Sequence, residues 1–269
     1  MELFADRFLV GPRDPVDLAT GDLVRLTVEA APDRRGTLAR TRLCDQLATL
    51  RHPLLVPLVD YGVAHDRWFE AHVSLPPIRT SAAETRRHAL HLGRFLKATG
   101  VEIPADAVER HVRSAVKAVA PGQRPLGVHL ADRSAIDPIR LLFDGSGPPG
   151  TSCAVLRGVL GAGLRTLAMQ AARLARLQGL VPIDRRVAAS AEIADICLGR
   201  HLCVFDWTGD EGLPHVLAPG KADTLRRHVW LRLRRTGPDV PTDRDAKRTL
   251  WLERLSVARM ISSIFLDTE

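Results

Sequence analysis

A glycine-rich segment at residues 158–166 has the composition of a loop that binds phosphate. Gly158, Gly161 and Gly163 carry no side chain, so backbone amides there can approach phosphate oxygens closely. The segment follows an apolar run typical of a strand and precedes a pattern typical of a helix. A strand, a glycine loop and a helix in this order indicate an anion-binding turn.

The residues after the glycines depart from what a nucleotide requires. Such a loop needs a lysine for the β and γ phosphates, followed by a hydroxyl that binds Mg²⁺. Leu164 and Arg165 stand at these two places, with Thr166 next. Arg165 or Thr166 would compensate only if the loop were shifted by one residue. We therefore name Arg165 and Thr166 as nucleotide-binding candidates of a degenerate motif.

A buried-looking strand, HLCVFDWT, ends at Asp206 about forty residues later. With this strand, the glycine segment resembles P-loop ATPases of the bacterial AAA or signalling type. The resemblance implies that Asp206 is the Walker B-like carboxylate that holds Mg²⁺, and that Mg-ATP is the cofactor if any binds. Trp207 stands where the acid that polarises water is expected. Hydrolysis is therefore not the leading expectation.

Two segments near the N-terminus, LATGDLVRLTVEAA and LATLRHPLLVPLVDYG, resemble the small lobe of serine/threonine protein kinases over residues 5–75. The resemblance implies a phosphate-binding lysine at Thr27 and its carboxylate partner near Leu43, and neither is present. Asp45 lies two residues away, off that helix face. No H-R-D or D-F-G motif follows, so we expect a pseudokinase-like scaffold without phosphoryl transfer.

The elements that would position these residues fall into two classes. Short alternating runs and one helix over 38–50 predict a small antiparallel sheet, and later strand–helix–strand repeats predict a parallel one. The expected fold class is α+β followed by α/β. The expected domains are a kinase small-lobe-like domain at 1–80, a mostly helical connection at 81–143, a Gly/Pro-rich linker at 144–152, and a P-loop ATPase-like domain at 153–269.

Composition limits the cellular setting. The chain has 269 residues, 45% hydrophobic and 26% charged, and no apolar run of membrane-spanning length. Four cysteines without a C-x-x-C spacing predict free, buried thiols. We therefore expect a cytoplasmic protein that does not enter a membrane. The net charge is +7, but only four of the 38 basic residues are lysines, and the charges are dispersed.

Other patterns offer weaker sites. His88 and His91 have helical spacing, but no cysteine or carboxylate completes a ligand set, so no metal site is predicted. The stretch from Arg226 to Arg259 is rich in basic residues and is a nucleic-acid candidate. It lacks a helix-turn-helix pattern and aromatic interleaving, which favours a solvated face or an internal docking surface.

The order of the two parts resembles bacterial signalling and transcription regulators, with Fis-type regulators as a candidate parent family. We expect a non-catalytic regulator that acts through contacts with protein partners or other domains of a larger regulator. Any link to DNA would be indirect. Two alternatives stay open, which are a weak ATPase using residues 158–166 and a nucleic-acid contact through Arg226–Arg259. Whether more chain follows also stays open.

Overall fold

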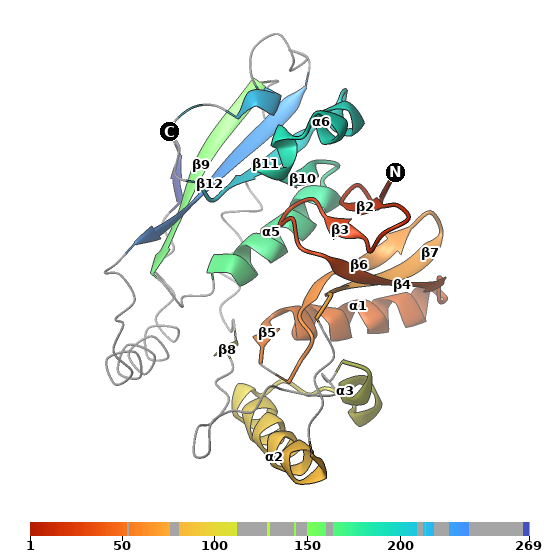
Figure 1. Ribbon diagram of the computed structural model, residues 1–269. Coiled ribbons are helices and arrows are strands. Elements are labelled where there is room, and N and C mark those ends of the chain that lie inside the picture. The colour runs from red at the N-terminus through yellow and green to blue at the C-terminus, as the bar shows by residue number, and fades with distance from the viewer. Residues whose placement is uncertain are drawn as a thin grey trace. The chain divides into compact units, whose positions relative to one another are not determined.

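A computed structural model describes residues 1–52, 54–75, 81–111, 128–129, 143, 150–159, 164–208, 212, 214–217, 226–236 and 266–268. The chain forms two compact units (Figure 1). One unit combines Met1–Leu23 with Asp132–Glu269, and the other is Val24–Ala131. We call them the α/β unit and the α+β unit.

The α/β unit contains a sheet of four parallel strands with a fifth, antiparallel strand on one edge (Figure 1). The strand order is β10-β11-β12-β9-β13. The strands are β9 (Gly150–Val159), β10 (Val181–Asp184), β11 (Leu202–Asp206), β12 (Arg227–Thr236) and β13 (Leu266–Thr268). The helices are α5 (Leu164–Leu177), α6 (Ala191–Cys197) and the short 3-10 turns η2 (Val187–Ala189) and η3 (His215–Leu217).

Both faces of this sheet are buried. On one face, α5 packs its Leu167, Ala171 and Ala175 against a cluster that includes Phe205 and Leu231. The opposite face is covered by residues of α6, of η2 and of the N-terminal segment, in a second cluster. This explains why the strands are nearly continuous apolar runs, and it confirms the predicted α/β arrangement of the second half.

The first three strands belong to the α/β unit. They form an antiparallel sheet of β1 (Glu2–Phe4), β2 (Phe8–Val10) and β3 (Val16–Asp17). Leu18 is fully buried in the second cluster, and its carbonyl accepts a hydrogen bond from the Asp184 backbone N–H at 2.7 Å. The domain predicted at 1–80 groups these strands with the kinase-like segment, whereas they belong to the α/β unit. Alternating apolar residues indicate which face of a strand is buried but not against which sheet.

A buried ion pair closes this N-terminal sheet. The Nε and Nη2 of Arg7 donate to the two carboxylate oxygens of Asp17, each at 2.8 Å, and both side chains are fully buried. The same carboxylate accepts from the Ala19 backbone N–H and the Thr20 hydroxyl, both at 3.1 Å. All four bonds satisfy a charge that water does not reach.

The α+β unit is built on three antiparallel strands with the order β4-β7-β6. The strands and the helix between the first two are β4 (Val24–Ala30), α1 (Arg34–Ala48), β6 (Leu58–Ala64) and β7 (Arg67–Val73). Asp33 caps α1 by accepting a hydrogen bond from the Gly36 N–H at 2.7 Å. Cys44 and Leu47 of α1 pack on Trp68. The predicted small antiparallel sheet with one helix is therefore present.

The connecting region also contributes to this unit. It includes α2 (Ala82–Thr99) and α3 (Ala105–His111), and strand β8 (Val128–His129) pairs with β5 (Leu50–Arg51). Leu92 of α2 packs with Leu50, Leu54 and Leu55. Of the predicted 144–152 linker, residues 144–149 lie outside the described residues, and 150–152 already belong to β9.

We expect Arg7→Met to destabilise the α/β unit by about 3–5 kcal/mol, because it leaves the Asp17 carboxylate buried without a cation. Hydrogen exchange of β10 amides would measure this loss. The control is Arg200→Met, whose partner Asp6 is half exposed, and which should cost less than about 1 kcal/mol. Similar losses in both variants would contradict the prediction.

Candidate functional site

The carboxyl ends of the parallel strands bring the predicted nucleotide residues to one edge of the sheet. β9 ends at Val159 before the glycine segment, and β11 ends at Asp206. Such edges are the usual ligand sites of parallel sheets. Gly158 lies in β9, opposite Arg235 of β12, whereas Gly161 and Gly163 lie outside the described residues.

Asp206 is the best-defined residue of this edge, and its carboxylate is fully engaged. Oδ1 accepts from the Thr208 hydroxyl at 2.7 Å and from the Thr208 backbone N–H at 3.0 Å. Oδ2 accepts from Arg185 Nη1 at 2.9 Å and from Trp230 Nε1 at 3.3 Å. Since a carboxylate has about four acceptor positions, these four donors fill them.

The electrostatics of Asp206 follow from these contacts. Burial by itself would raise the pKa of Asp206, but the hydrogen bonds from Thr208 and Arg185 and the positive charge of Arg185 outweigh it. The pKa of Asp206 therefore lies below its usual value, and the carboxylate is ionised at neutral pH. Its negative charge is compensated by the guanidinium of Arg185, which is itself mostly buried.

This arrangement does not fit a magnesium ion. A Walker B-like aspartate must offer an oxygen to Mg²⁺ or to its water shell, and Mg²⁺ demands near-ideal octahedral geometry. At Asp206 the oxygens are already occupied, and the Arg185 guanidinium would repel a second cation at the same carboxylate. The Mg-ATP cofactor implied by the P-loop resemblance is therefore not matched by the residues present.

The first turn of α5 also lacks a nucleotide arrangement. Leu164 begins the helix at the lysine position. Arg165 is exposed and forms an ion pair with Asp22 of the same unit, and Thr166 is buried. Among the described residues, the hydrogen bonds of Asp206 go to Arg185, Thr208 and Trp230. The structure thus places Arg165, Thr166 and Asp206 on neighbouring elements without joining them in one hydrogen-bond network.

The kinase-like positions lie on the α+β unit. Thr27 is exposed on β4 and stands opposite Glu70 of β7. Leu43 is half-buried on α1, and Asp45 accepts a hydrogen bond from the Tyr61 hydroxyl. The lysine–carboxylate pair of a kinase has no counterpart at these described positions.

No sequence pattern points to the residues that donate hydrogen bonds to the Asp206 carboxylate. Arg185 follows β10 directly, and β10 pairs in parallel with β11, so Arg185 lies beside the end of the neighbouring strand. Trp230 comes from β12, on the other side of β11. Only the strand order reveals these contacts. None of the four cysteines forms a disulfide, and the predicted burial holds for Cys44, Cys197 and Cys203, whereas Cys153 is half-buried.

Comparison with known proteins gives no support from relatives. No family model, no curated protein and no solved structure matches this chain. Within the described residues, no helix combines the length and the apolar character needed to cross a membrane.

We expect Asp206→Asn to destabilise the α/β unit by about 1.5–3 kcal/mol at pH 7, because the amide nitrogen cannot accept the hydrogen bonds of charged Arg185. The native pKa is lowered, so this stabilisation is present above about pH 4 and is lost as the pH falls below it. Denaturant unfolding at pH 7 and pH 3 would measure both. Exposed Asp195→Asn should change stability by less than about 0.5 kcal/mol. A loss as large at pH 3 as at pH 7 would contradict the mechanism.

Proposed function

We propose that this chain is a non-catalytic regulatory or signalling protein that acts through protein contacts, with a pseudo-ATPase α/β unit and a pseudokinase-like α+β unit. The observation that carries the proposal is the set of hydrogen bonds that the Asp206 carboxylate accepts. Four donors of the chain itself, including the cation of Arg185, occupy the carboxylate that a P-loop ATPase would offer to magnesium.

The strand order of the α/β unit supports the P-loop part of the proposal. β9 leads to the glycine segment and β11 ends at Asp206, and β12 lies between them in the sheet. The helix α5 follows the glycine segment, as it does after a phosphate-binding loop. We interpret this framework as that of a P-loop domain in which the residues that handle phosphate are substituted.

The α+β unit supports the pseudokinase-like part in the same way. β4, α1 and β6 follow one another along the chain, as a strand, the regulatory helix and a later strand do in the kinase small lobe that these segments resemble. The face of β4 that would carry the lysine carries Thr27 instead. A scaffold that keeps its packing without this charge is suited to binding rather than to phosphoryl transfer.

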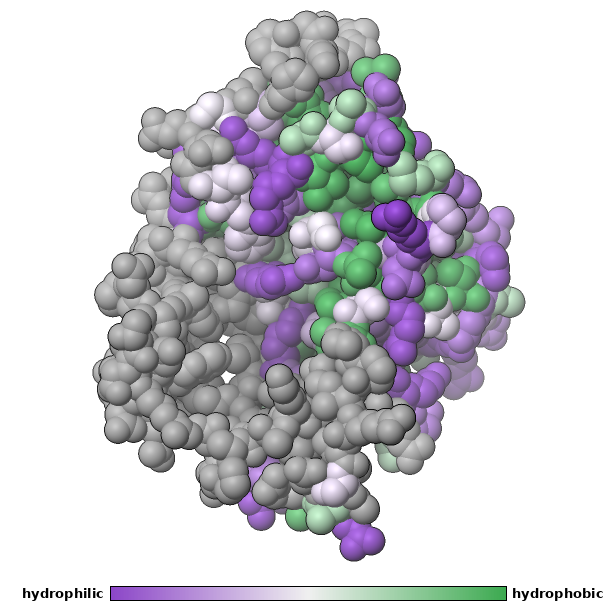
Figure 2. Space-filling model, viewed as in Figure 1, coloured by the Kyte–Doolittle hydropathy of each residue, from purple (hydrophilic) through white to green (hydrophobic). Residues whose placement is uncertain are grey.

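A surface on α2 offers chemistry for a protein contact. It encloses a shallow hollow of about 650 Å³ with an apolar floor and a cationic rim. Leu90, one of its apolar lining residues, is 65% exposed. On the face of the molecule drawn in Figure 2, hydrophobic residues lie among hydrophilic ones. Such a hollow would take an apolar segment bearing acidic side chains. It is lined by Arg86, Ala89, Leu90, Gly93, Arg94 and Lys97.

Of the alternatives, a nucleic-acid contact through Arg226–Arg259 has little to support it in the described part of that stretch. Up to Thr236 it forms β12, in which Val229, Leu231 and Leu233 are core residues. The remainder lies outside the described residues.

We expect calorimetric titration with Mg-ATP to give no saturable binding to the full chain, because no lysine is present in the loop motif and Asp206 is occupied. A dissociation constant in the low micromolar range would overturn the proposal. Phosphate release above background that Asp206→Ala abolishes would favour the weak-ATPase alternative instead.

A variant that restores the residues of the nucleotide-binding motif tests whether the fold can bind nucleotide once these residues are present. Leu164→Lys with Arg165→Thr restores the lysine and hydroxyl, and Arg185→Ala frees the Asp206 carboxylate. We expect this triple variant to gain saturable Mg-ATP binding. A folded triple variant that binds no nucleotide would contradict the P-loop assignment. Leu164→Met is the matched control, since it keeps an apolar residue at the lysine position.

A further inference from the structure

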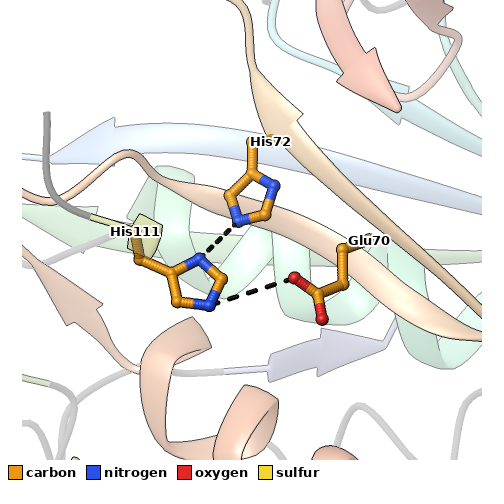
Figure 3. A group of neighbouring side chains, drawn as sticks. All are labelled: Glu70, His72 and His111. Atoms are coloured by element: carbon orange, nitrogen blue, oxygen red, sulfur yellow. Dashed lines mark hydrogen bonds and ion pairs between the residues drawn. The ribbon is translucent and has the colours of Figure 1, made fainter. Parts of the chain in front are cut away.

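Three side chains of the α+β unit, none of them a nucleotide candidate, converge on one another. Glu70 and His72 are two residues apart on β7, so they point to the same face of the sheet. His111 is the last residue of α3, and its carbonyl accepts the Val56 backbone N–H at 2.9 Å. Figure 3 shows the three side chains directed toward one another.

The distances are those of a compact ligand set. His72 Nε2 lies 3.0 Å from His111 Nδ1, and His111 Nε2 lies 3.9 Å from Glu70 Oε2. One ligand atom from each residue can be chosen so that all lie within 4.8 Å of one another. Ligand atoms of a tetrahedral zinc ion are about 3.3 Å apart. Side-chain rotations that displace the ligand atoms by up to about 1.5 Å would therefore complete the geometry.

The environment keeps both imidazoles in the form that binds metals. Burial, followed by the charges of His111 and Arg25, lowers the pKa of His72 to about 3. Burial likewise lowers the pKa of His111, although Glu70 opposes the shift. Burial thus favours the uncharged form of both rings.

The hydrogen bonds of the three side chains show which contact a metal ion would displace, since His72 Nε2 is hydrogen-bonded to His111 Nδ1. Glu70 Oε1 accepts from Trp68 Nε1 at 3.1 Å, which anchors the carboxylate while Oε2 faces His111. His72 Nδ1 is buried and has no hydrogen-bond partner within the described part of the chain. A proton on Nδ1 makes Nε2 the acceptor of the hydrogen bond with His111 Nδ1, and a metal ion would take the place of that bond.

We propose that Glu70, His72 and His111 form a zinc site with three protein ligands and a fourth position for water. Two histidines and one glutamate are a common ligand set for Zn²⁺ with an open position. The bound ion would fasten α3 to β7, two elements that are far apart in the sequence. This site is independent of the proposed regulatory function and of the nucleotide motif.

Arg25 sets the strength of the site. It is the cross-strand partner of His72, and its charge acts on both histidines. A guanidinium charge near the two histidines opposes a divalent cation, so the site has an electrostatic penalty. Removal of this charge should therefore tighten the binding of metal, whereas removal of a ligand should weaken it.

The test is calorimetric titration of the chelator-treated full chain with ZnCl₂, with Co²⁺ absorption as the report of tetrahedral geometry. We expect one ion per chain. Glu70→Gln and His111→Ala should each weaken binding by about a hundredfold or more, and Arg25→Gln should strengthen it. His65→Asn is the control, because His65 is exposed in the β6–β7 turn with a positive φ that asparagine tolerates.

The folded state is checked by the melting temperature with chelator present. Zn²⁺ should raise the melting temperature of the wild-type chain and of His65→Asn, and this shift should be absent in Glu70→Gln. If His111→Ala does not fold, Glu70→Gln decides, since glutamine keeps the shape and the bond from Trp68. The absence of 1:1 binding to the wild-type chain, or equal binding to Glu70→Gln, would overturn the proposal.

Discussion

The ion pair between Arg185 and Asp206 is the constraint on which the α/β unit depends. A buried carboxylate at the end of a parallel strand must be neutralised, either by an ion from solution or by a cation of the chain. Here the chain supplies the cation from the end of β10 and a further donor, Trp230, from β12. One side chain on β11 therefore links this strand to the end of β10 and to β12. This edge of the sheet is held together without a ligand.

The coarse fold could be predicted from the sequence because its signals are local. Alternating short strands, one capped helix and later strand–helix–strand repeats indicate α+β followed by α/β, and both are present. The unit to which β1–β3 belong could not be predicted in this way. Leu18 contacts a cluster formed by residues beyond position 180, and no local pattern reports such a partner.

The candidate site could be predicted only in part, because some of its contacts join residues that are distant in the sequence. Asp206 was found because a buried strand ends at an acid, but Arg185 became relevant only once β10 was known to lie beside β11. The Glu70–His72 spacing on one strand is a visible signal for two ligand-type residues. His111 is distant in sequence and meets them through the position of α3, which periodicity does not predict.

The assignment of residues 1–23 to the α/β unit has a consequence for how the chain is made. In sequence terms, Val24–Ala131 is an insertion within that unit. Arg7 can meet Asp17 within the first segment, but Leu18 and the apolar residues around it cannot be covered until β10 and β11 have been synthesised. During that interval these apolar residues are exposed, which favours transient contacts with a chaperone.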